Sequence, residues 1–148
     1  QRGEPFFSRR FEFGGRDLTQ AIVARLEVPF EEAEEWKLAA GSGGPAFRVD
    51  WNGRELQAVR QALERDLVDE VRRSLAFYRT LGHLPEALRL QLSGATARLP
   101  GIAEQLGGML GLPVSVFDPL AELGGAARAR VSGGPQFAQA YGLALRNS

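Results

Sequence analysis

The sequence contains no cysteine, and its 148 residues include one histidine, one lysine and one methionine. The lack of cysteine excludes disulfide bonds, thiolate metal sites and cysteine nucleophiles. One histidine is too few for a zinc site or a two-histidine relay. The sequence motifs of phosphate-binding P-loops, zinc proteases and serine hydrolases are missing as well. We therefore expect no metal-binding residue and no catalytic residue in this chain.

Neither an excess of one charge nor a long hydrophobic run is present. Eighteen basic residues balance 18 acidic ones, so the formal net charge is zero. Nucleic-acid binding needs a basic surface that neutralises phosphates, so this balance argues against it. The longest uncharged apolar run, residues 105–117, is too short to cross a bilayer and is interrupted by glycines and a proline. We expect a soluble cytoplasmic protein that does not insert into a membrane.

The beginning of the chain predicts a strand followed by a helix. Residues 6–13 are rich in aromatic side chains and partly alternate, which is typical of a strand. After Gly14-Gly15, the residues Leu18, Ile22 and Leu26 are spaced to share one helical face. Asp17 is the expected N-cap of this helix.

Two further helices and a short strand are predicted before residue 80. Pro29 separates the first helix from a second over residues 30–41. The alternation in residues 47–51 predicts a short strand. From Leu56 to Tyr78, apolar residues recur every three or four positions, which predicts one long helix with Asn52 as its N-cap.

The second half of the chain has a strand–helix–strand pattern. Residues 88–92 alternate as a strand, a helix follows up to Gly111, and residues 114–116 alternate as a second strand. A connection of this kind makes the two strands parallel neighbours. After an irregular segment, Pro135 fits the first turn of a last helix. The predicted fold class is α/β.

The turn after the strand at residues 88–92 is a candidate ligand site. Gly94 has no side chain, so a flat base or a ribose can approach its backbone closely. Arg98 offers a planar guanidinium that stacks on aromatic rings. The alternative is that Gly94 serves only a tight turn between a strand and a helix.

Two other pairs of residues are candidates. Gly14-Gly15 forms a turn between a strand and a helix that we expect to need positive φ angles. Glu34 and Lys37 lie three residues apart, so a carboxylate and an ammonium face the same side of a helix. The alternatives are a structural role for the glycines and a solvated surface pair for Glu34 and Lys37.

Four segments in order resemble motifs of the actin-like ATPase superfamily, which includes heat-shock chaperones, actin and FtsA. Residues 13–19 resemble its Gly-Gly turn, and residues 33–37 (Ala-Glu-Glu-Trp-Lys) resemble its A-E-x-x-K helix. Residues 92–101 resemble its adenosine motif, and residues 140–144 resemble its second connecting helix. The resemblance implies ATP binding, with Gly14, Gly15, Glu34, Lys37, Gly94, Ala95 and Arg98 as nucleotide-binding residues.

Within this superfamily, residues 14–22, 72–78 and 141–146 resemble the PilM family of type IV pilus assembly proteins. The resemblance implies an α/β, ribonuclease H-like second lobe of an actin-like ATPase, incomplete at its start and carrying a helical insertion. Residues 1–17 and 86–148 would form the sheet-containing subdomain, and residues 18–85 the helical one. The incomplete sheet would leave an edge open to a second copy of the chain.

The same resemblance implies a cellular role. PilM-family proteins bind the cytoplasmic tail of PilN at the inner face of the bacterial inner membrane, on a platform for pilus extension, twitching motility and DNA uptake. The ligands of magnesium and the phosphates would lie mostly outside this chain, so we expect the chain alone to have no ATPase activity.

Two other functions remain open at this point. One is an actin-like scaffold without a working nucleotide site, similar to the cytoplasmic domain of GspL in type II secretion. Ala95 favours this alternative, because the superfamily motif has glycine at that position and a methyl group would crowd a bound base. The other is a small-molecule kinase on the same fold, which would need an acidic catalytic base in the first lobe.

Overall fold

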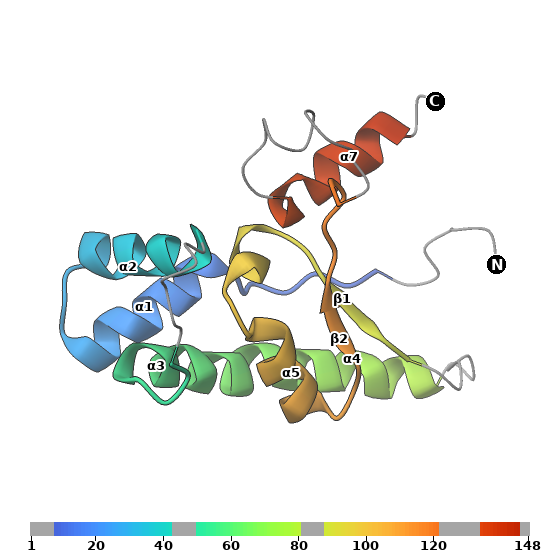
Figure 1. The fold of residues 1–148 in the computed structure, drawn as a ribbon. Helices are drawn as coiled ribbons and strands as arrows, with labels where there is room; N and C mark the ends of the chain where they lie inside the picture. Colours follow the sequence, from blue (N-terminus) through green and yellow to red (C-terminus); the bar gives the residue numbers. More distant parts are fainter. Residues whose placement is uncertain (1–7, 43–49, 81–87, 122–133, 146–148) are drawn as a thin grey trace.

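The computed structural model describes residues 8–42, 50–80, 88–121 and 134–145. This part of the chain is mostly helical, with a two-stranded parallel sheet. In Figure 1, the helices α1 and α2 lie together at one end, and one long helix runs beneath the sheet. The α/β class is thus confirmed in its coarse form, with helix dominating.

The first two helices are α1 (Gly15–Leu26) and α2 (Phe30–Ser42). Leu18 and Ile22 are fully buried on one face of α1, as predicted. The prediction of Asp17 as the N-cap is wrong, because the helix begins two residues earlier. Asp17 lies in its first turn, where its carboxylate accepts a hydrogen bond from the Gly14 amide (2.7 Å). The side chain still satisfies a free N–H at the helix start, but from inside the helix.

The predicted long helix consists of α3 (Arg54–Ala62), a π-helical segment η1 (Leu63–Val68) and α4 (Asp69–Thr80). A π-turn holds more residues than an α-turn, so it shifts the buried face partway along the helix. The apolar spacing predicts Leu67 as the buried residue at this point, but Val68 is fully buried and Leu67 only partly. The helix is confirmed. The buried position moves from Leu67 to Val68 within η1, whereas Val71, Leu75 and Tyr78 on α4 are partly buried, as their spacing predicts.

The N-cap of the long helix is Gly53, so the prediction of Asn52 is wrong. The preceding turn is organised by Asp50. Its carbonyl accepts a hydrogen bond from the Gly53 amide (2.8 Å) and its carboxylate accepts one from the Asn52 amide (2.9 Å). Asp50, three residues before the N-cap, therefore fixes the helix start by forming a local turn.

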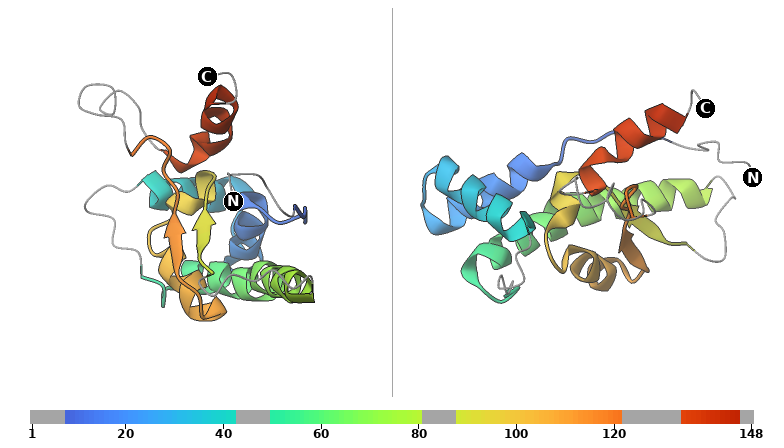
Figure 2. Two further views of the ribbon diagram at one scale, coloured as in Figure 1. Left: turned by 90° about the vertical axis from the view of Figure 1, so that its right-hand side faces the viewer. Right: turned by 45° about the horizontal axis from the view of Figure 1, so that its top comes forward.

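The sheet consists of β1 (Leu90–Leu92) and β2 (Val114–Val116), which lie side by side in Figure 2. They are parallel, and Leu90 pairs with Val114. Between them the chain passes through the 3₁₀ turn η2 (Ala95–Arg98) and the helix α5 (Ile102–Leu110). The predicted strand–helix–strand unit is confirmed.

Two predicted strands are corrected. Residues 8–13 form no strand, and residues 6–7 lie outside the described part of the chain. Strands are stable only with a paired neighbour, and within the described residues this segment has none. Arg9 is held instead by an ion pair with Glu70 on α4 (2.9 Å). Of the predicted strand at 47–51, residues 47–49 also lie outside, and Trp51 lies in a turn where its indole N–H donates to the Pro100 carbonyl (2.9 Å).

The predicted last helix is confirmed. It begins with the 3₁₀ turn η3 (Pro135–Phe137) and continues as α7 (Ala138–Leu145). Figures 1 and 2 show α7 projecting from the rest of the molecule, on the side of the sheet away from the long helix. Leu143 and Leu145 are 55% and 57% exposed. The irregular segment predicted before η3 lies mostly outside the described residues.

One hydrophobic core joins these elements. Its buried side chains come from α1, α2, the long helix, α5 and the turn before α5, and they include Leu18, Leu56, Leu63, Leu99 and Leu106. The core thus contains residues from both predicted subdomains, and their division at residues 17 and 86 stays a prediction. In the described part of the chain, no helix combines the length and hydropathy needed to cross a membrane.

We predict that Gly101→Ala lowers the free energy of unfolding by more than about 2 kcal/mol. Gly101 has a φ of +80°, and an added Cβ would lie 2.5 Å from the indole Nε1 of Trp51. Urea denaturation followed by circular dichroism measures the change. Gly108→Ala in α5 is the matched control, because nothing lies within 4 Å of its added Cβ. The control should stabilise the protein slightly through better helix propensity; equal losses in both variants would contradict the steric argument.

Candidate functional site

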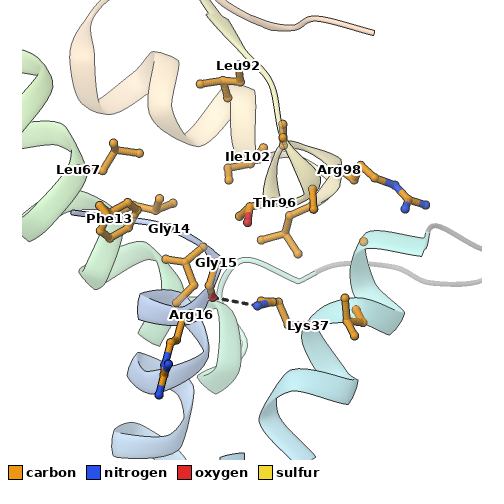
Figure 3. Close-up of a pocket in the computed structure, with 18 of the residues that line it drawn as sticks. Phe13, Gly14, Gly15, Arg16, Lys37, Leu67, Leu92, Thr96, Arg98 and Ile102 are labelled. Carbon is orange, nitrogen blue, oxygen red and sulfur yellow. Dashed lines mark hydrogen bonds between the residues drawn. The ribbon is translucent and has the colours of Figure 1, made fainter. Parts of the chain in front are cut away.

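The structure brings all the predicted site residues together around one cavity of about 1070 Å³. They come from the start of α1, from the middle of α2 and from the turn after β1, which are segments distant in sequence. Figure 3 shows how these segments converge. The residues are Gly14, Gly15, Glu34, Lys37, Gly94, Ala95 and Arg98. Their shared location is a property of the fold, whereas their role in nucleotide binding stays a prediction.

Lys37 is held between α1 and α2. Its ammonium group donates to the Gly15 carbonyl (2.8 Å), the Thr19 hydroxyl (2.7 Å) and the Glu34 carboxylate (2.7 Å). An ammonium has three protons to donate, and each has a protein acceptor here. The Lys37 side chain is only 10% exposed. The alternative of a solvated surface pair is therefore wrong for Lys37.

Glu34 faces the cavity beside Lys37, and its side chain is 31% exposed. Its Oε2 atom is contacted by Lys37 and also by the hydroxyl of Thr19. Hydrogen bonds from Lys37 and then Thr19 lower the pKa of the Glu34 carboxyl, and the positive charge of Lys37 adds to them against the effect of burial. Glu34 is therefore an ionised hydrogen-bond acceptor at neutral pH.

Thr19 is the residue of this cluster that the sequence did not single out. It is fully buried, and its hydroxyl lies within hydrogen-bonding distance of the Gly15 carbonyl (3.0 Å) and of Glu34. The available signal was its place beside Leu18 and one turn from Ile22, inside the buried stripe of α1. A threonine there must satisfy its hydroxyl within the protein.

The glycines at the start of α1 differ in what they allow. An added Cβ on Gly15 would lie 2.9 Å from the Thr96 hydroxyl and 3.3 Å from the Lys37 amine, whereas one on Gly14 meets nothing within 4 Å. The prediction of positive φ angles is wrong. Gly14 has an extended backbone (φ −163°), and Gly15 is not among the described residues with positive φ. Glycine is needed at position 15 for close approach.

Gly94 does have a positive φ, +97°. Nothing lies within 4 Å of an added Cβ, so the space beside its backbone is open. Its amide donates to the carbonyl of Pro135 (2.8 Å), which ties the turn to η3. The next residue, Ala95, is exposed at the start of η2, and Figure 3 shows the Arg98 side chain extending away from Gly15. The turn therefore presents the bare backbone of Gly94 to the cavity, and the Arg98 guanidinium lies farther from Gly15.

Apolar side chains form the opposite wall of the cavity. Phe13 and Leu67 lie on the side away from Lys37, and Leu92 and Ile102 continue this wall in Figure 3. The sequence predicted these residues as core or strand positions, so their contribution to a cavity was missed. The arrangement offers a hydrogen-bonding edge on α2 and an apolar surface within one space, a combination typical of small-molecule sites.

Fold and cavity together define a small α/β lobe with a ligand-sized cavity beyond the carboxyl end of a parallel strand. Residues 1–148 match the family model described as type IV pilus assembly protein PilM. A solved structure described as a PilM–PilN type IV pilus biogenesis complex is 31% identical in sequence, with a TM-score of 0.61. The chain belongs to the PilM family of type IV pilus assembly proteins, as the motif resemblance indicated.

The match to that structure covers 89% of this chain and 36% of the other chain. The sequence thus spans about a third of the length of the matched chain in that complex. The activity and the partners of a whole PilM-family protein are for this reason taken up below as proposals.

We predict that Glu34→Gln makes the stability of the protein less sensitive to acid. Folding lowers the pKa of Glu34 below its ordinary value of 4.5, so the ionised group stabilises the protein above that pH. This contribution is lost as the pH falls through the lowered pKa. The difference in the free energy of unfolding between wild type and Glu34→Gln should therefore be large at neutral pH and shrink in acid.

Urea denaturation at a series of pH values measures this difference. Glu35→Gln is the control, because Glu35 is exposed on the same helix and the substitution changes the net charge equally. A gap that is the same at all pH values, or equal in the two variants, would contradict the linkage of Glu34 to folding.

Proposed function

We propose that this chain contributes the base and ribose side of an ATP site in a PilM-family protein. In this proposal it is part of the C-terminal lobe of an actin-like ATPase fold. The observation that carries the proposal is the convergence of Gly14-Gly15, Glu34 with Lys37, and residues 94–98 on one cavity. These segments are the ones that resemble nucleotide-binding motifs of the superfamily.

The chemistry of the cavity fits a nucleoside. The ionised carboxylate of Glu34 is an acceptor for the hydroxyls of a ribose. The open space beside the backbone of Gly94 leaves room for a flat base. Arg98 supplies a guanidinium that stacks on such a ring, and the apolar wall with Leu92 and Ile102 covers its other parts.

The phosphates and magnesium are assigned mostly to other parts of the intact protein. Within the described residues, no group of three acidic or histidine side chains is placed to hold a metal ion. In this proposal, the chain binds and orients the base and the ribose of the nucleotide. Hydrolysis, if the intact protein performs it, depends on residues elsewhere.

The proposed cellular role follows from the family. We place the protein in the cytoplasm at the inner face of the bacterial inner membrane, within the platform that assembles type IV pili. Its proposed partner is the cytoplasmic tail of a PilN-type protein, because the matched structure is described as a PilM–PilN complex. An edge of the small sheet is available in this proposal for pairing with a second copy.

A scaffold without nucleotide binding is the second candidate. Two observations favour it: Ala95 stands where the superfamily motif has glycine, and the three donors of Lys37 already have protein acceptors. Titration of ATP into the intact protein separates the two functions, because a scaffold shows no saturable binding.

We predict that the intact protein binds ATP and that Lys37→Met weakens binding by about 10-fold or more. The substitution keeps the apolar part of the side chain but removes the group that holds Glu34 and the start of α1. Isothermal titration calorimetry gives the affinities. Arg25→Met is the control. Arg25 is exposed in the last turn of α1, and its substitution removes the same charge as Lys37→Met. Unchanged affinity in Lys37→Met would remove Lys37 from the site.

We also predict that the intact protein binds a peptide with the sequence of the cytoplasmic tail of PilN from the same bacterium. Fluorescence anisotropy of the labelled peptide should show saturable binding. A scrambled peptide of the same composition controls for charge. Equal binding of the two peptides would contradict a specific PilN partnership.

A further inference from the structure

In the partly buried cluster of Thr19, Glu34 and Lys37, the three side chains have different roles in the proposed site. Lys37 donates to Gly15, Thr19 and Glu34 at 2.7–2.8 Å. A bound ligand can be contacted by this ammonium only if one of these bonds is given up. Lys37 therefore holds protein atoms in place, and it has no free donor for a ligand.

Glu34 is held on one side only. Lys37 and Thr19 both contact its Oε2 atom. Within the described part of the chain, the other oxygen, Oε1, accepts no hydrogen bond. Glu34 lines the cavity and is 31% exposed, against 10% for Lys37. One oxygen is thus fixed by the protein, and the other is an acceptor without a partner among the described residues, in a side chain that lines the cavity.

Thr19 completes this arrangement from a second helix. Its hydroxyl accepts from Lys37 (2.7 Å) and has one proton to donate, which goes to Glu34 or to the Gly15 carbonyl. Thr19 is fully buried, so water cannot replace these bonds. The threonine therefore links the start of α1 to the carboxylate on α2.

We propose that Thr19 is a positioning residue of this site: together with Lys37 it holds one oxygen of Glu34, so that the other oxygen accepts hydrogen bonds from the ribose hydroxyls. This inference rests on the proposed nucleotide site. It makes Glu34 the residue that selects for a ribose with its hydroxyls, and it makes the effect of Lys37 and Thr19 on that selection indirect. The lowered pKa of Glu34 agrees with this role, because an ionised carboxylate only accepts hydrogen bonds.

The test compares the affinity of the intact protein for ATP with that for 2′,3′-dideoxyATP, which lacks both ribose hydroxyls. Wild type should prefer ATP by about 10-fold or more, since unpaired polar groups in a site penalise an analogue that lacks their partners. Thr19→Val has nearly the same shape without the hydroxyl, and it should bring this ratio close to one. Thr19→Ser keeps the hydroxyl and should restore the preference.

A double-mutant cycle shows whether Thr19 acts through Glu34. Glu34→Gln should itself abolish the preference for ATP. If Thr19 only positions Glu34, then Thr19→Val should change the ratio no further in the Glu34→Gln background. Lys37→Met provides a second route to the same result should Thr19→Val fail to fold, because it also releases the carboxylate.

The possible results separate failure of the ATP site from failure of the role proposed for Thr19. If wild type binds neither nucleotide, the proposed ATP site and this inference both fail. If wild type prefers ATP but Thr19→Val weakens both nucleotides equally, or adds its full effect to that of Glu34→Gln, Thr19 has only a structural role and the ATP site stands. Loss of the preference, its return in Thr19→Ser and non-additivity with Glu34→Gln support the inference.

Discussion

The ammonium of Lys37 is the interaction on which the geometry of the cavity depends. A charge that is largely removed from water needs a full set of acceptors, and those acceptors come from both α1 and α2. The distance between the two helices is thereby fixed at the end of the cavity. Gly15 must lack a side chain because the amine and the Thr96 hydroxyl approach it so closely. The hydrogen bond from Lys37 also keeps Glu34 ionised, so one ammonium group both joins the two helices and sets the charge of the carboxylate in the cavity.

Much of this fold could be predicted from the sequence because its elements are defined locally. The spacing of Leu18 and Ile22 gave the buried face of α1, and the alternation around Leu90 and Val114 gave two strands whose short helical connection makes them parallel. The polar residues of the cavity could be predicted for a different reason. Its polar residues lie in three motifs that can be identified separately, and the fold then brings these motifs together.

The features that the sequence did not predict depend on contacts between residues distant in sequence, which no local pattern contains. Residues 8–13 have the alternation of a strand, but pairing decides whether a strand forms, and the described part of the chain supplies no neighbour. The shift from Leu67 to Val68 on the long helix comes from the π-helical segment η1, which apolar spacing alone does not indicate. Thr19 was missed because its importance comes from a side chain on another helix.

The hydrogen bond between the Gly94 amide and the Pro135 carbonyl joins the turn after β1 to the segment before the C-terminal helix. Gly94 belongs to the wall of the cavity, and Pro135 begins the segment that leads into the projecting helix α7 (Figure 1). A displacement of α7 that carries Pro135 with it must either break this bond or move the cavity wall. The shape of the cavity wall at Gly94 and the position of the C-terminal helix are therefore mechanically connected through this backbone hydrogen bond.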